Sequence, residues 1–525
     1  MSVQALNYQP ETLARELKPF YIGASEADQK AMLQAVGLKN LDDLYAHIGA
    51  EYKFKGPINL PRHMEYKELI QHMNDLANKN KRVASFISDG LPAWRPTDVV
   101  GPVCSIRGLT TAYTPYQPER SQGTLQTLWI YQSLLGQLTG FEAINASLYE
   151  RSTCLYEALL CAQRIVKNST TVIVAETLYP GDLEVLDTHA IETNLKIQRA
   201  PVSSTTGTLD LAALEKMLVP GVAAVAFPQI NCLGNMEEVD ALTDMCAAHG
   251  VKSIAVVDPM LLQNLKPPVS YGKHGTDMVV AEGQHLALGP NFGGPGLGIF
   301  GIRYSERDKN SIRSTAGRYI GKTVDNKGRE CKALILSTRE QHIRREKATS
   351  NICSNQSFVA SLAGACLMAR GDEGLQKAAQ IAHDGIRRVV REITKSKGVT
   401  LRFAHTPSFN EVVLKLPVKT AELQAKARAH GLHIGVDVSH RFKNIQGENL
   451  LLLAVTDWQS ESDITKLVQF FHKELGDTAS HQEVASVPEN FRRHSAPGIP
   501  KLASKDIIEY YNKLGQQNLS PDDGI

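Results

Sequence analysis

The stretch Ala112–Gly123 (AYTPYQPERSQG) combines several side chains that could bind a ligand. Its two prolines fix their own φ angles and push the preceding residues out of the helical region, so the stretch should be a stiff, extended loop. A helical pattern begins directly behind it, with Ser121 as the N-cap. Such a loop could present Tyr113, Tyr116 and Gln122 to a ligand. The alternative is a surface loop pinned by its prolines, which the local pattern by itself favours.

Three further positions could serve a phosphorylated cofactor. Asp258 follows the apolar run 254–257 and precedes Pro259. An acid at the carboxyl end of a central strand can hold a pyridinium nitrogen, but an Asp-Pro pair is also a common turn. Ser152 and Thr153 stand at the start of a helical pattern, where free N–H groups favour a phosphate. Simple N-capping is the alternative there, and it is favoured on local grounds.

The glycine-rich run 293–301 contains a literal GxGxxG at Gly296–Gly301. A dinucleotide site needs a strand before this motif and a helix after it. Here Pro290-Asn291-Phe292 precedes the motif, and the strand-like run 298–302 overlaps its end. We therefore reject a nicotinamide site and interpret the glycines as permitting close approach of the backbone.

The remaining reactive residue types indicate neither a metal site nor a nucleophile. Arg344, Arg345 and Lys347 could bind an anion, or they form a solvated basic helix end. No HExxH, P-loop or GxSxG motif is present. The eight cysteines form no CxxC pair and stand at no ligand spacing to histidines. We expect reduced thiols in a cytoplasmic protein and no bound metal.

Short apolar runs alternate with helical patterns through the middle of the chain. Strands are predicted at 171–175, 223–227, 253–257, 277–281 and 298–302, and helices at 125–138, 154–166, 182–186, 211–218 and 239–249. Continuously apolar strands between amphipathic helices indicate a mostly parallel sheet covered on both faces. The stretch 313–340 reads as irregular and polar. Helices at 358–368, 375–395, 420–430 and 462–475, with strands at 411–416 and 450–455, predict a smaller α+β domain.

These patterns divide the chain into four regions. Residues 1–110 form a helical N-terminal segment, with helices predicted from Ser25 to Val36, at 41–48 and at 66–77. Residues 111–330 form the large α/β domain, and residues 331–475 form the small α+β domain. Residues 476–525 form a polar linker and a tail with its own helix at 504–514.

Bulk properties exclude two classes of partner. The chain has 525 residues, and 57 Lys and Arg against 55 Asp and Glu give a formal charge of +2. This near balance implies no polyanionic partner, so we expect no nucleic-acid binding. No run approaches the roughly 18 apolar residues of a membrane span, and the N-terminus resembles neither a signal nor a transit peptide. We expect no contact with membranes.

Several stretches together resemble the glycine cleavage system P-protein family. They are 112–126, 138–150, the Asp258-Pro259 strand end, 277–284, 292–300 and 339–353. The resemblance covers essentially residues 10–475, and the best fit is the first subunit of the two-subunit form. It implies an α/β fold like that of aspartate aminotransferase and other pyridoxal-phosphate (PLP) dependent transferases. It also implies decarboxylation of glycine, with transfer of the aminomethyl group to a lipoyl carrier (H) protein.

The resemblance implies that the catalytic lysine lies on another chain. Family members that carry the cofactor hold it through a lysine that follows a histidine, shortly before a glycine-rich loop. That pattern, laid on residues 284–290, places His285 at the lysine position, and no lysine lies between Lys273 and Arg303. Histidine cannot form a Schiff base with PLP. We therefore expect no catalytic residue on this chain, and a partner subunit 2 that carries PLP.

The same resemblance assigns the remaining candidate residues. Ser152, Thr153 and Asp258 become vestigial cofactor positions. The residues expected to line a site shared with subunit 2 come from the loop 112–123: Tyr113, Tyr116, Glu119 and Gln122. Residues 489–525 resemble the opening of subunit 2 itself, so the chain is either a cut fusion or has retained a docking arm.

Two segments depart from the family pattern. Ser88-Asp89-Gly90 stands where Gly-x-Gly is usual, and Glu150-Arg151-Ser152 replaces the usual Asp-Gly-Thr turn. Arg151 could fill the space of a phosphate or contact the partner. These departures keep open a degenerate relative that binds partners without supporting turnover. A self-sufficient PLP enzyme that uses Lys266 or Lys273 is a third alternative.

Overall fold

A computed structural model of the chain describes residues 25–56, 59–62, 64–110, 115–291, 293–304, 311–335, 341–352, 356–445 and 447–494. The chain divides into two compact units, Met1–Lys81 and Arg82–Ile525. The first unit contains α2 (Glu26–Ala35), the 3-10 turn η1 (Leu41–Tyr45) and α3 (Tyr66–Asn78), which confirms the three predicted helical segments. The Ser25 hydroxyl accepts a hydrogen bond from the Asp28 N–H and so caps α2. No described residue from 25 to 81 is buried.

The second unit is built on a seven-stranded sheet with the order β2-β8-β7-β6-β5-β3-β4. Its strands are β2 (Ala143–Ile144), β3 (Thr171–Ala175), β4 (Lys196–Ala200), β5 (Val222–Pro228), β6 (Lys252–Val257), β7 (Met278–Glu282) and β8 (Gly298–Ile302). The pairs from β4 to β7 are parallel, whereas β8 is antiparallel to both its neighbours. The five predicted strands are confirmed, because strands buried on both faces read as continuous apolar runs.

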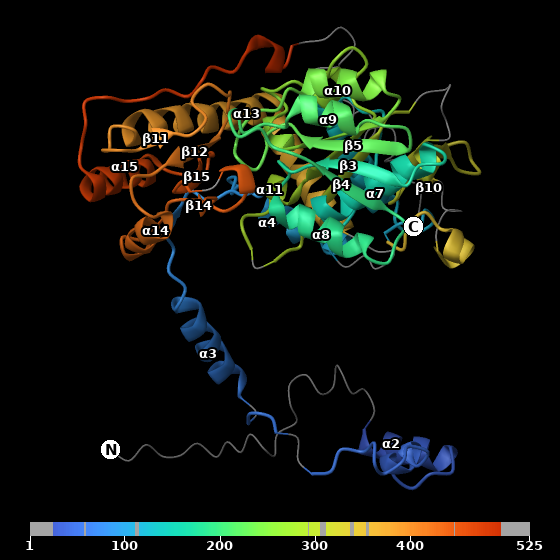
Figure 1. Ribbon diagram of the computed structural model, residues 1–525. Helices are drawn as coiled ribbons and strands as arrows, with labels where there is room; N and C mark the ends of the chain where they lie inside the picture. The colour runs from blue at the N-terminus through green and yellow to red at the C-terminus, as the bar shows by residue number, and fades with distance from the viewer. Residues whose placement is uncertain are drawn as a thin grey trace, which may run out of the picture. The chain divides into compact units, whose positions relative to one another are not determined.

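Helices surround this sheet to form the large domain (Figure 1). They are α4 (Val100–Cys104), α5 (Arg107–Thr110), α6 (Gln122–Thr139), α7 (Arg151–Ile165), α8 (Pro180–Ala190), α9 (Leu211–Met217), α10 (Val239–Ala248) and α11 (Gln284–Ala287). Helix α7 packs on β5, β7 and β8, and α10 packs on β6. The carboxyl ends of β6 and β7 therefore open beside the N-terminus of α7, at the edge of the sheet where parallel α/β proteins bind their ligands.

Part of the large domain differs from the predicted pattern. Residues 319–335, expected to be irregular, form an antiparallel hairpin of β9 (Tyr319–Val324) and β10 (Glu330–Ile335). Strand β4 was also missed. Both are largely exposed and charged, so they lack the apolar runs that mark buried strands. The helix α12 (Gln341–Arg344) follows the hairpin.

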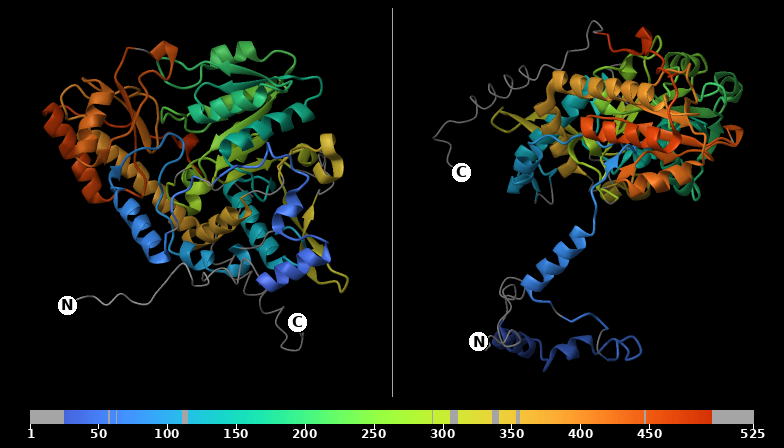
Figure 2. Two further views of the ribbon diagram at one scale, coloured as in Figure 1. Left: turned by 90° about the horizontal axis from the view of Figure 1, so that it is seen from below. Right: turned by 90° about the vertical axis from the view of Figure 1, so that its left-hand side faces the viewer.

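The small domain is a four-stranded antiparallel sheet with the order β11-β12-β15-β14. Its strands are β11 (Thr400–Leu401), β12 (Glu411–Lys415), β14 (Val436–Asp437) and β15 (Leu450–Ala454), and its helices are α14 (Thr420–Ala429) and α15 (Glu461–Leu475). The long helical element α13 (Ser357–Ile393), which is interrupted by non-helical backbone at Gly371, belongs to both domains, as Figure 2 shows. Its residues up to Ala382 lie in the core of the large domain, and those from Ile386 lie in the core of the small domain.

Two segments connect the domains outside α13. Residues 84–85 form β1, which pairs in parallel with β13 (Leu432–His433), so the chain touches the small domain before it enters the large one. Residues 476–494, expected as a linker, form a strap that we describe below. The division into regions at residues 110, 330 and 475 stays a prediction. The residues from 495 to 525, with the helix expected at 504–514, lie outside the described residues.

Candidate functional site

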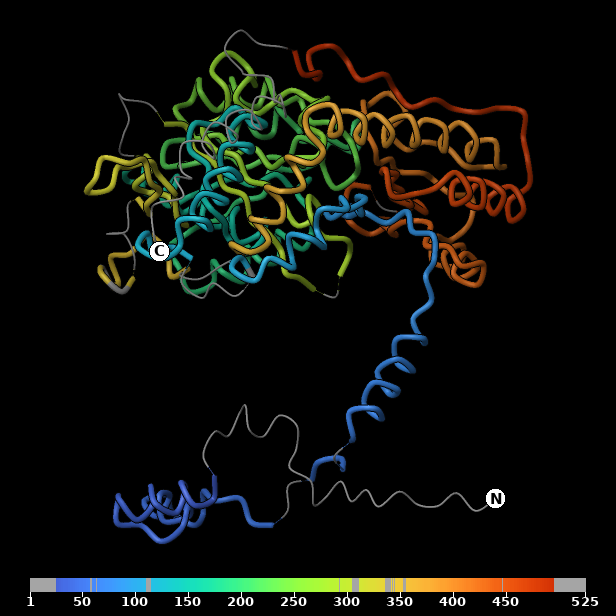
Figure 3. Tube along the Cα trace, turned by 180° about the vertical axis from the view of Figure 1, so that it is seen from behind, coloured from blue at the N-terminus to red at the C-terminus, as the bar shows by residue number. Residues whose placement is uncertain are grey.

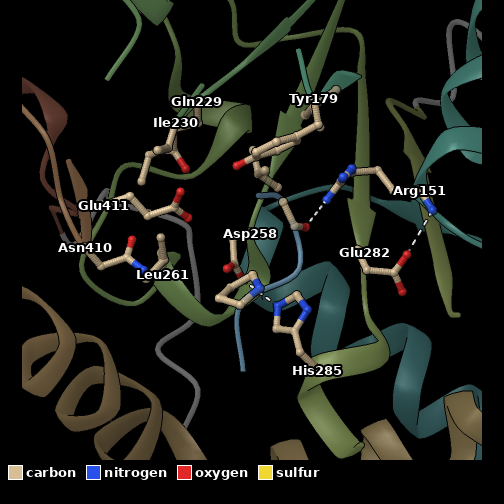
Figure 4. Close-up of a pocket in the computed structure, with 14 residues that line it drawn as sticks. Arg151, Tyr179, Gln229, Ile230, Asp258, Leu261, Glu282, His285, Asn410 and Glu411 are labelled. Carbon is tan, nitrogen blue, oxygen red and sulfur yellow. Dashed lines mark hydrogen bonds and ion pairs between the residues drawn. The ribbon is translucent and has the colours of Figure 1, made fainter. Parts of the chain in front are cut away.

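A cleft lies where the ends of β6 and β7, the N-terminus of α7 and residues of the small domain meet (Figure 4). Its charged and polar lining comes mainly from Arg151, Tyr179, Asp258, Glu282, His285 and Glu411. The space open to the centre of a water molecule is about 20 Å³. A single buried water needs roughly 10–15 Å³ by this measure, so the cleft is almost filled by its own side chains.

Asp258 and His285 bond to each other in this cleft. His285 Nε2 lies 2.8 Å from Asp258 Oδ1, and the same oxygen accepts a hydrogen bond of 2.9 Å from the N–H of Met260. His285 is only 4% exposed. Asp258 follows β6, as predicted, and it also caps the short turn η2 (Pro259–Leu261). Asp258 is thus a turn residue at the end of β6, and one of its oxygens is occupied by groups of this chain, whereas its role toward a pyridinium nitrogen stays a prediction.

The N-terminus of α7 is closed by carboxylates of the chain. Glu150 is the N-cap, and its Oε1 accepts hydrogen bonds from the Thr153 N–H at 3.2 Å and from the Ser152 hydroxyl at 3.1 Å. The Thr153 hydroxyl also contacts this oxygen. A carboxylate therefore already occupies the donors that would favour a phosphate here. Ser152 and Thr153 belong to the capping turn, with Glu150 rather than Ser152 as the cap.

Glu282, at the end of β7, gathers three main-chain N–H groups. Its Oε1 accepts from Gln284 at 2.9 Å and from Leu297 at 2.8 Å, and its Oε2 accepts from Arg151 at 3.1 Å. Glu282 is 7% exposed. This carboxylate thus supplies the negative charge at a place where a helix N-terminus and a loop point their donors inward.

The side chain of Arg151 crosses the cleft. Its guanidinium forms a two-pronged ion pair with Asp182, at 2.6 Å and 3.2 Å, and donates to the carbonyl of Gly90. It also lies 4.5 Å from the ring centre of Tyr179. A side chain on Gly90 would clash with this guanidinium, which explains the glycine there. Whether Arg151 fills the space of a phosphate or contacts the partner stays a prediction, and its guanidinium is engaged within the chain.

The small domain contributes Glu411, at the start of β12. The Ser88 hydroxyl donates a hydrogen bond of 2.6 Å to its Oε1, and the neighbouring Asp89 pairs with Arg441 at 3.0 Å. Burial raises the pKa of Glu411 to about 7. The departure at residues 88–90 therefore has a structural explanation: Ser88 and Asp89 tie the entering chain to the small domain.

Replacement of Glu411 by glutamine should flatten the dependence of stability on pH. Because the folded-state pKa of Glu411 is raised from 4.5 to about 7, its proton stabilises the fold fully below about pH 4.5. This contribution is lost as the pH rises to about 7, at up to about 1.4 kcal/mol per pH unit. Urea unfolding at several pH values between these limits should show a shallower decline for Glu411→Gln than for the parent.

A matched control is Glu422→Gln, because the Glu422 side chain is 65% exposed. That variant should follow the parent profile. Glu237, whose pKa burial also raises to about 7, titrates equally in all three proteins and cancels in the comparison. Parallel profiles for Glu411→Gln and the parent would contradict the assignment.

The loop expected to carry the shared site lies apart from this cleft. Tyr113 lies outside the described residues. Arg318 stacks on the ring of Tyr116, at 4.4 Å from its centre, and Glu119 is exposed. Gln122 clips the loop to β10, because its amide exchanges hydrogen bonds of 2.9 Å and 2.8 Å with the main chain of Lys332. None of these described residues lines the cleft, and their role in a shared site stays a prediction.

The glycine-rich run behaves as its interpretation requires. An added Cβ on Gly298 would lie 2.4 Å from Sγ of Cys154, and one on Gly296 would lie 2.7 Å from Cβ of Glu150. The run leads into β8 and not into a helix. Close packing of this strand against α7 is therefore the reason for the glycines.

Sequence patterns did not single out Glu282 or Glu411 as cleft residues. Glu282 directly follows the predicted strand 277–281, and this position at the end of a strand, three residues before His285, was the available signal. Glu411 bonds to a residue 323 positions away in the sequence, so no local pattern could join them. Within the described residues, no cluster of three or more His, Cys, Asp or Glu side chains could hold a metal ion.

The architecture defines the class of protein first. A solved NifS-like protein superposes with a TM-score of 0.55 at 15% identity, over 75% of this chain and 99% of that chain. The chain therefore has the aspartate-aminotransferase-like α/β fold of the PLP-dependent transferases, and the predicted fold class is confirmed.

More specific matches define the family. The family model for the glycine cleavage system P-protein matches residues 19–471. A probable glycine dehydrogenase (decarboxylating) subunit 1 from Chloroherpeton thalassium is 35% identical over 452 residues, which are 86% of this chain and 98% of the relative. A crystal structure of glycine decarboxylase (P-protein) of the glycine cleavage system, in inhibitor-bound form, superposes with a TM-score of 0.77 at 32% identity, over 86% of this chain and 99% of that chain. The chain belongs to the glycine cleavage system P-protein family.

The cleft of this chain does not fit the PLP that its fold class implies. His285, which the sequence predicts to stand at the position of the cofactor lysine, is bonded to Asp258, the acid predicted to face a pyridinium nitrogen. Glu150 and Glu282 occupy the donors that would bind the phosphate. Lys266 is paired with Asp240 at 2.8 Å and does not line the cleft, which argues against its use as a cofactor lysine.

Proposed function

We propose that the chain is the cofactor-free first subunit of a two-subunit glycine decarboxylase of the glycine cleavage system. In this proposal, a homologous second subunit carries PLP and its lysine. Glycine and the lipoyl carrier (H) protein then bind to the assembled pair. The match to subunit 1 relatives over nearly their whole length supports this function over a degenerate relative without turnover.

One observation carries the proposal: the cleft is closed by bonds among the chain's own residues. The Arg151 guanidinium pairs with Asp182, the Glu282 carboxylate accepts a hydrogen bond from the Arg151 N–H, and His285 bonds to Asp258, so these groups are engaged within the chain. A chain with this fold and this closed cleft contributes to decarboxylation through an assembly. It does so by stabilising the cofactor-bearing subunit and by lending surface residues to its site.

The proposed shared surface is the loop at the N-terminus of α6. Tyr116 is held in place by Arg318, and the Gln122–Lys332 clip fixes the end of the loop against β10. Glu119 is exposed between them. Since Gln122 is engaged within the chain, it serves to fix the loop, whereas Tyr113, Tyr116 and Glu119 are the residues that we propose to face the partner.

Two further parts of the proposal concern the tail and the compartment. We propose that residues 489–525 resemble the opening of a second subunit. We also propose a cytoplasmic location, since all seven cysteines in the described part of the chain are free thiols and four of them are fully buried. No helix within the described residues is long and apolar enough to cross a membrane.

Reconstitution tests the function directly. The purified chain is mixed with the separately purified PLP-bearing subunit 2, and the exchange of the glycine carboxyl group with bicarbonate is measured with and without carrier protein. The expected result is exchange that requires both chains. Exchange by subunit 2 at the same rate without this chain would refute the proposal.

The same assay tests the shared surface through Tyr116→Phe. This variant keeps the aromatic ring under Arg318 and removes only the hydroxyl group, so the chain should fold as before. We expect a lower rate from the mixed pair with an unchanged circular dichroism spectrum. A control is Tyr52→Phe, which alters a tyrosine that is 81% exposed in the first unit. Equal rates for both variants and the parent would show that the loop is a simple surface loop and not part of a shared site.

A further inference from the structure

Residues 476–494, the strap, lie beyond the residues that match the family model, yet they are bound closely to the second unit. Figure 3 shows the strap in red, leaving the end of α15 at the small domain and crossing to the large domain. An extended segment with this path touches both domains in succession. Its contacts fall into three groups, which are separate along the sequence.

The first group fixes the strap to the small domain. Gln482 exchanges two hydrogen bonds there: its N–H donates to the Thr394 hydroxyl at 2.8 Å, and its Oε1 accepts from the Leu401 N–H at 2.6 Å. Val484 is 6% exposed and joins the small-domain core beneath β12 and α15. The hydrogen bonds of Gln482 and the buried side chain of Val484 thus hold the small-domain end of the strap.

The second group inserts apolar side chains into the large domain. Val487 is 6% exposed and Phe491 is 4% exposed, and both belong to the large-domain core. Phe491 buries more apolar surface than Val487 because its side chain is larger, so Phe491 is the main apolar anchor. The polar residues around these two give the strap the appearance of a linker in the sequence.

The third group is centred on Arg493. Its main chain pairs with the segment that follows Asp258: the Arg493 N–H donates to Asn264 at 2.9 Å, and the Lys266 N–H donates to Phe491 at 2.9 Å. Its guanidinium donates to the carbonyls of Leu262 at 2.7 Å, Leu138 at 2.9 Å and Gln137 at 3.3 Å.

The carbonyls of Leu138 and Gln137 belong to the C-terminal turn of α6, where carbonyl groups have no hydrogen-bond partners within the helix. A cation at this end also complements the helix dipole. Arg493 therefore joins α6 to the η2 segment that carries Asp258. The planar fork of an arginine suits three carbonyls in this arrangement better than a lysine would.

We infer that this face of the second unit is a docking site for an extended peptide segment, occupied here in cis by residues 482–493. It recognises an amide side chain followed by two valines, a phenylalanine and an arginine at the spacing of Gln482, Val484, Val487, Phe491 and Arg493. The same chemistry would accept an equivalent segment from a second chain in trans. This inference does not depend on the proposed function.

The test converts the strap into a non-covalent ligand after the chain has folded. A protease site is placed between Ala479 and Ser480, both of which are exposed, and the full chain is cut and passed through size exclusion. We expect the fragment that begins at residue 480 to co-elute with the body. Release of the fragment from the otherwise unchanged chain at micromolar concentration would overturn the inference.

Matched variants test which contacts hold the segment. Arg493→Ala removes three charge-assisted hydrogen bonds and should weaken retention by about 10- to 100-fold. Arg492→Ala is the control, because Arg492 is 54% exposed and its Nε lies 3.4 Å from a single carbonyl. Equal retention of these two fragments would overturn the assignment of Arg493.

A synthetic peptide of residues 480–494 separates cis from trans binding. Added in excess to the cut chain, it should displace the fragment, and the same peptide with Phe491→Ala should not. Displacement of the fragment by both peptides would show that this face has no sequence-specific docking site. The same conclusion would follow if neither peptide displaced a fragment that is seen to exchange freely.

Discussion

Replacement of Arg151 by alanine is expected to destabilise the second unit by about 3–5 kcal/mol. The Arg151 and Asp182 side chains are only 12% and 8% exposed, so the variant leaves the Asp182 carboxylate buried without its counter-charge. The carbonyl of Gly90 loses its donor and the ring of Tyr179 loses its cation as well. Urea unfolding followed by far-ultraviolet circular dichroism measures the change.

Two variants calibrate this result. Arg303→Ala breaks a pair with Glu142 in which both side chains are about 40% exposed, and it should cost no more than about 1 kcal/mol. Arg151→Lys keeps the charge but not the two-pronged geometry, so it should fall between the parent and the alanine variant. If Arg151→Ala were no worse than Arg303→Ala, the network around Arg151 would not be what closes the cleft.

A second expected result is that the chain takes up no PLP, and that His285→Lys does not change this. A lysine at position 285 would supply the amine, but it would lie beside Asp258 in a cleft with room for little more than a water molecule. The phosphate would also have to enter beside Glu150 and Glu282, whose carboxylates hold the donors it needs. Burying like charges together is strongly unfavourable.

The measurement is the pyridoxal absorbance after incubation with PLP and dialysis, followed by borohydride reduction and peptide mass analysis. The proposed PLP-bearing subunit 2, treated in parallel, should retain one reduced cofactor per chain. Near-ultraviolet circular dichroism checks that His285→Lys is folded. A reduced pyridoxyl group on the parent chain, or at the substituted position 285, would contradict the closed cleft.

The core of the fold could be predicted because its strands are buried on both faces. The runs 171–175 and 298–302 coincide with β3 and β8, and the others differ from their strands by a residue or so at each end. Strand β4 and the β9–β10 hairpin contain polar and charged residues that interrupt any apolar run, so their pairing depends on neighbours that no local pattern reveals. The strap was predicted as a linker because only a few of its residues are anchors.

The candidate site could be predicted where its residues follow strands or begin helices. Asp258 and His285 lie at the carboxyl ends of adjacent parallel strands, so their proximity follows from the strand order. Arg151 was recognised as an unusual residue, but its partner Asp182 was not. Glu411 enters the cleft from the small domain, and its position depends on how the two domains pack against each other.

The helix α13 has a thermodynamic consequence. The helical stretch of α13 after the break at Gly371 supplies side chains such as Leu375 to the first core and Val389 to the second, so neither core can lose its order without exposing part of the other. Such a shared element couples the unfolding of the two cores, because unravelling of the helix from either end removes contacts in both cores. The two domains should therefore melt as one calorimetric unit, with equal van't Hoff and calorimetric enthalpies for the second unit.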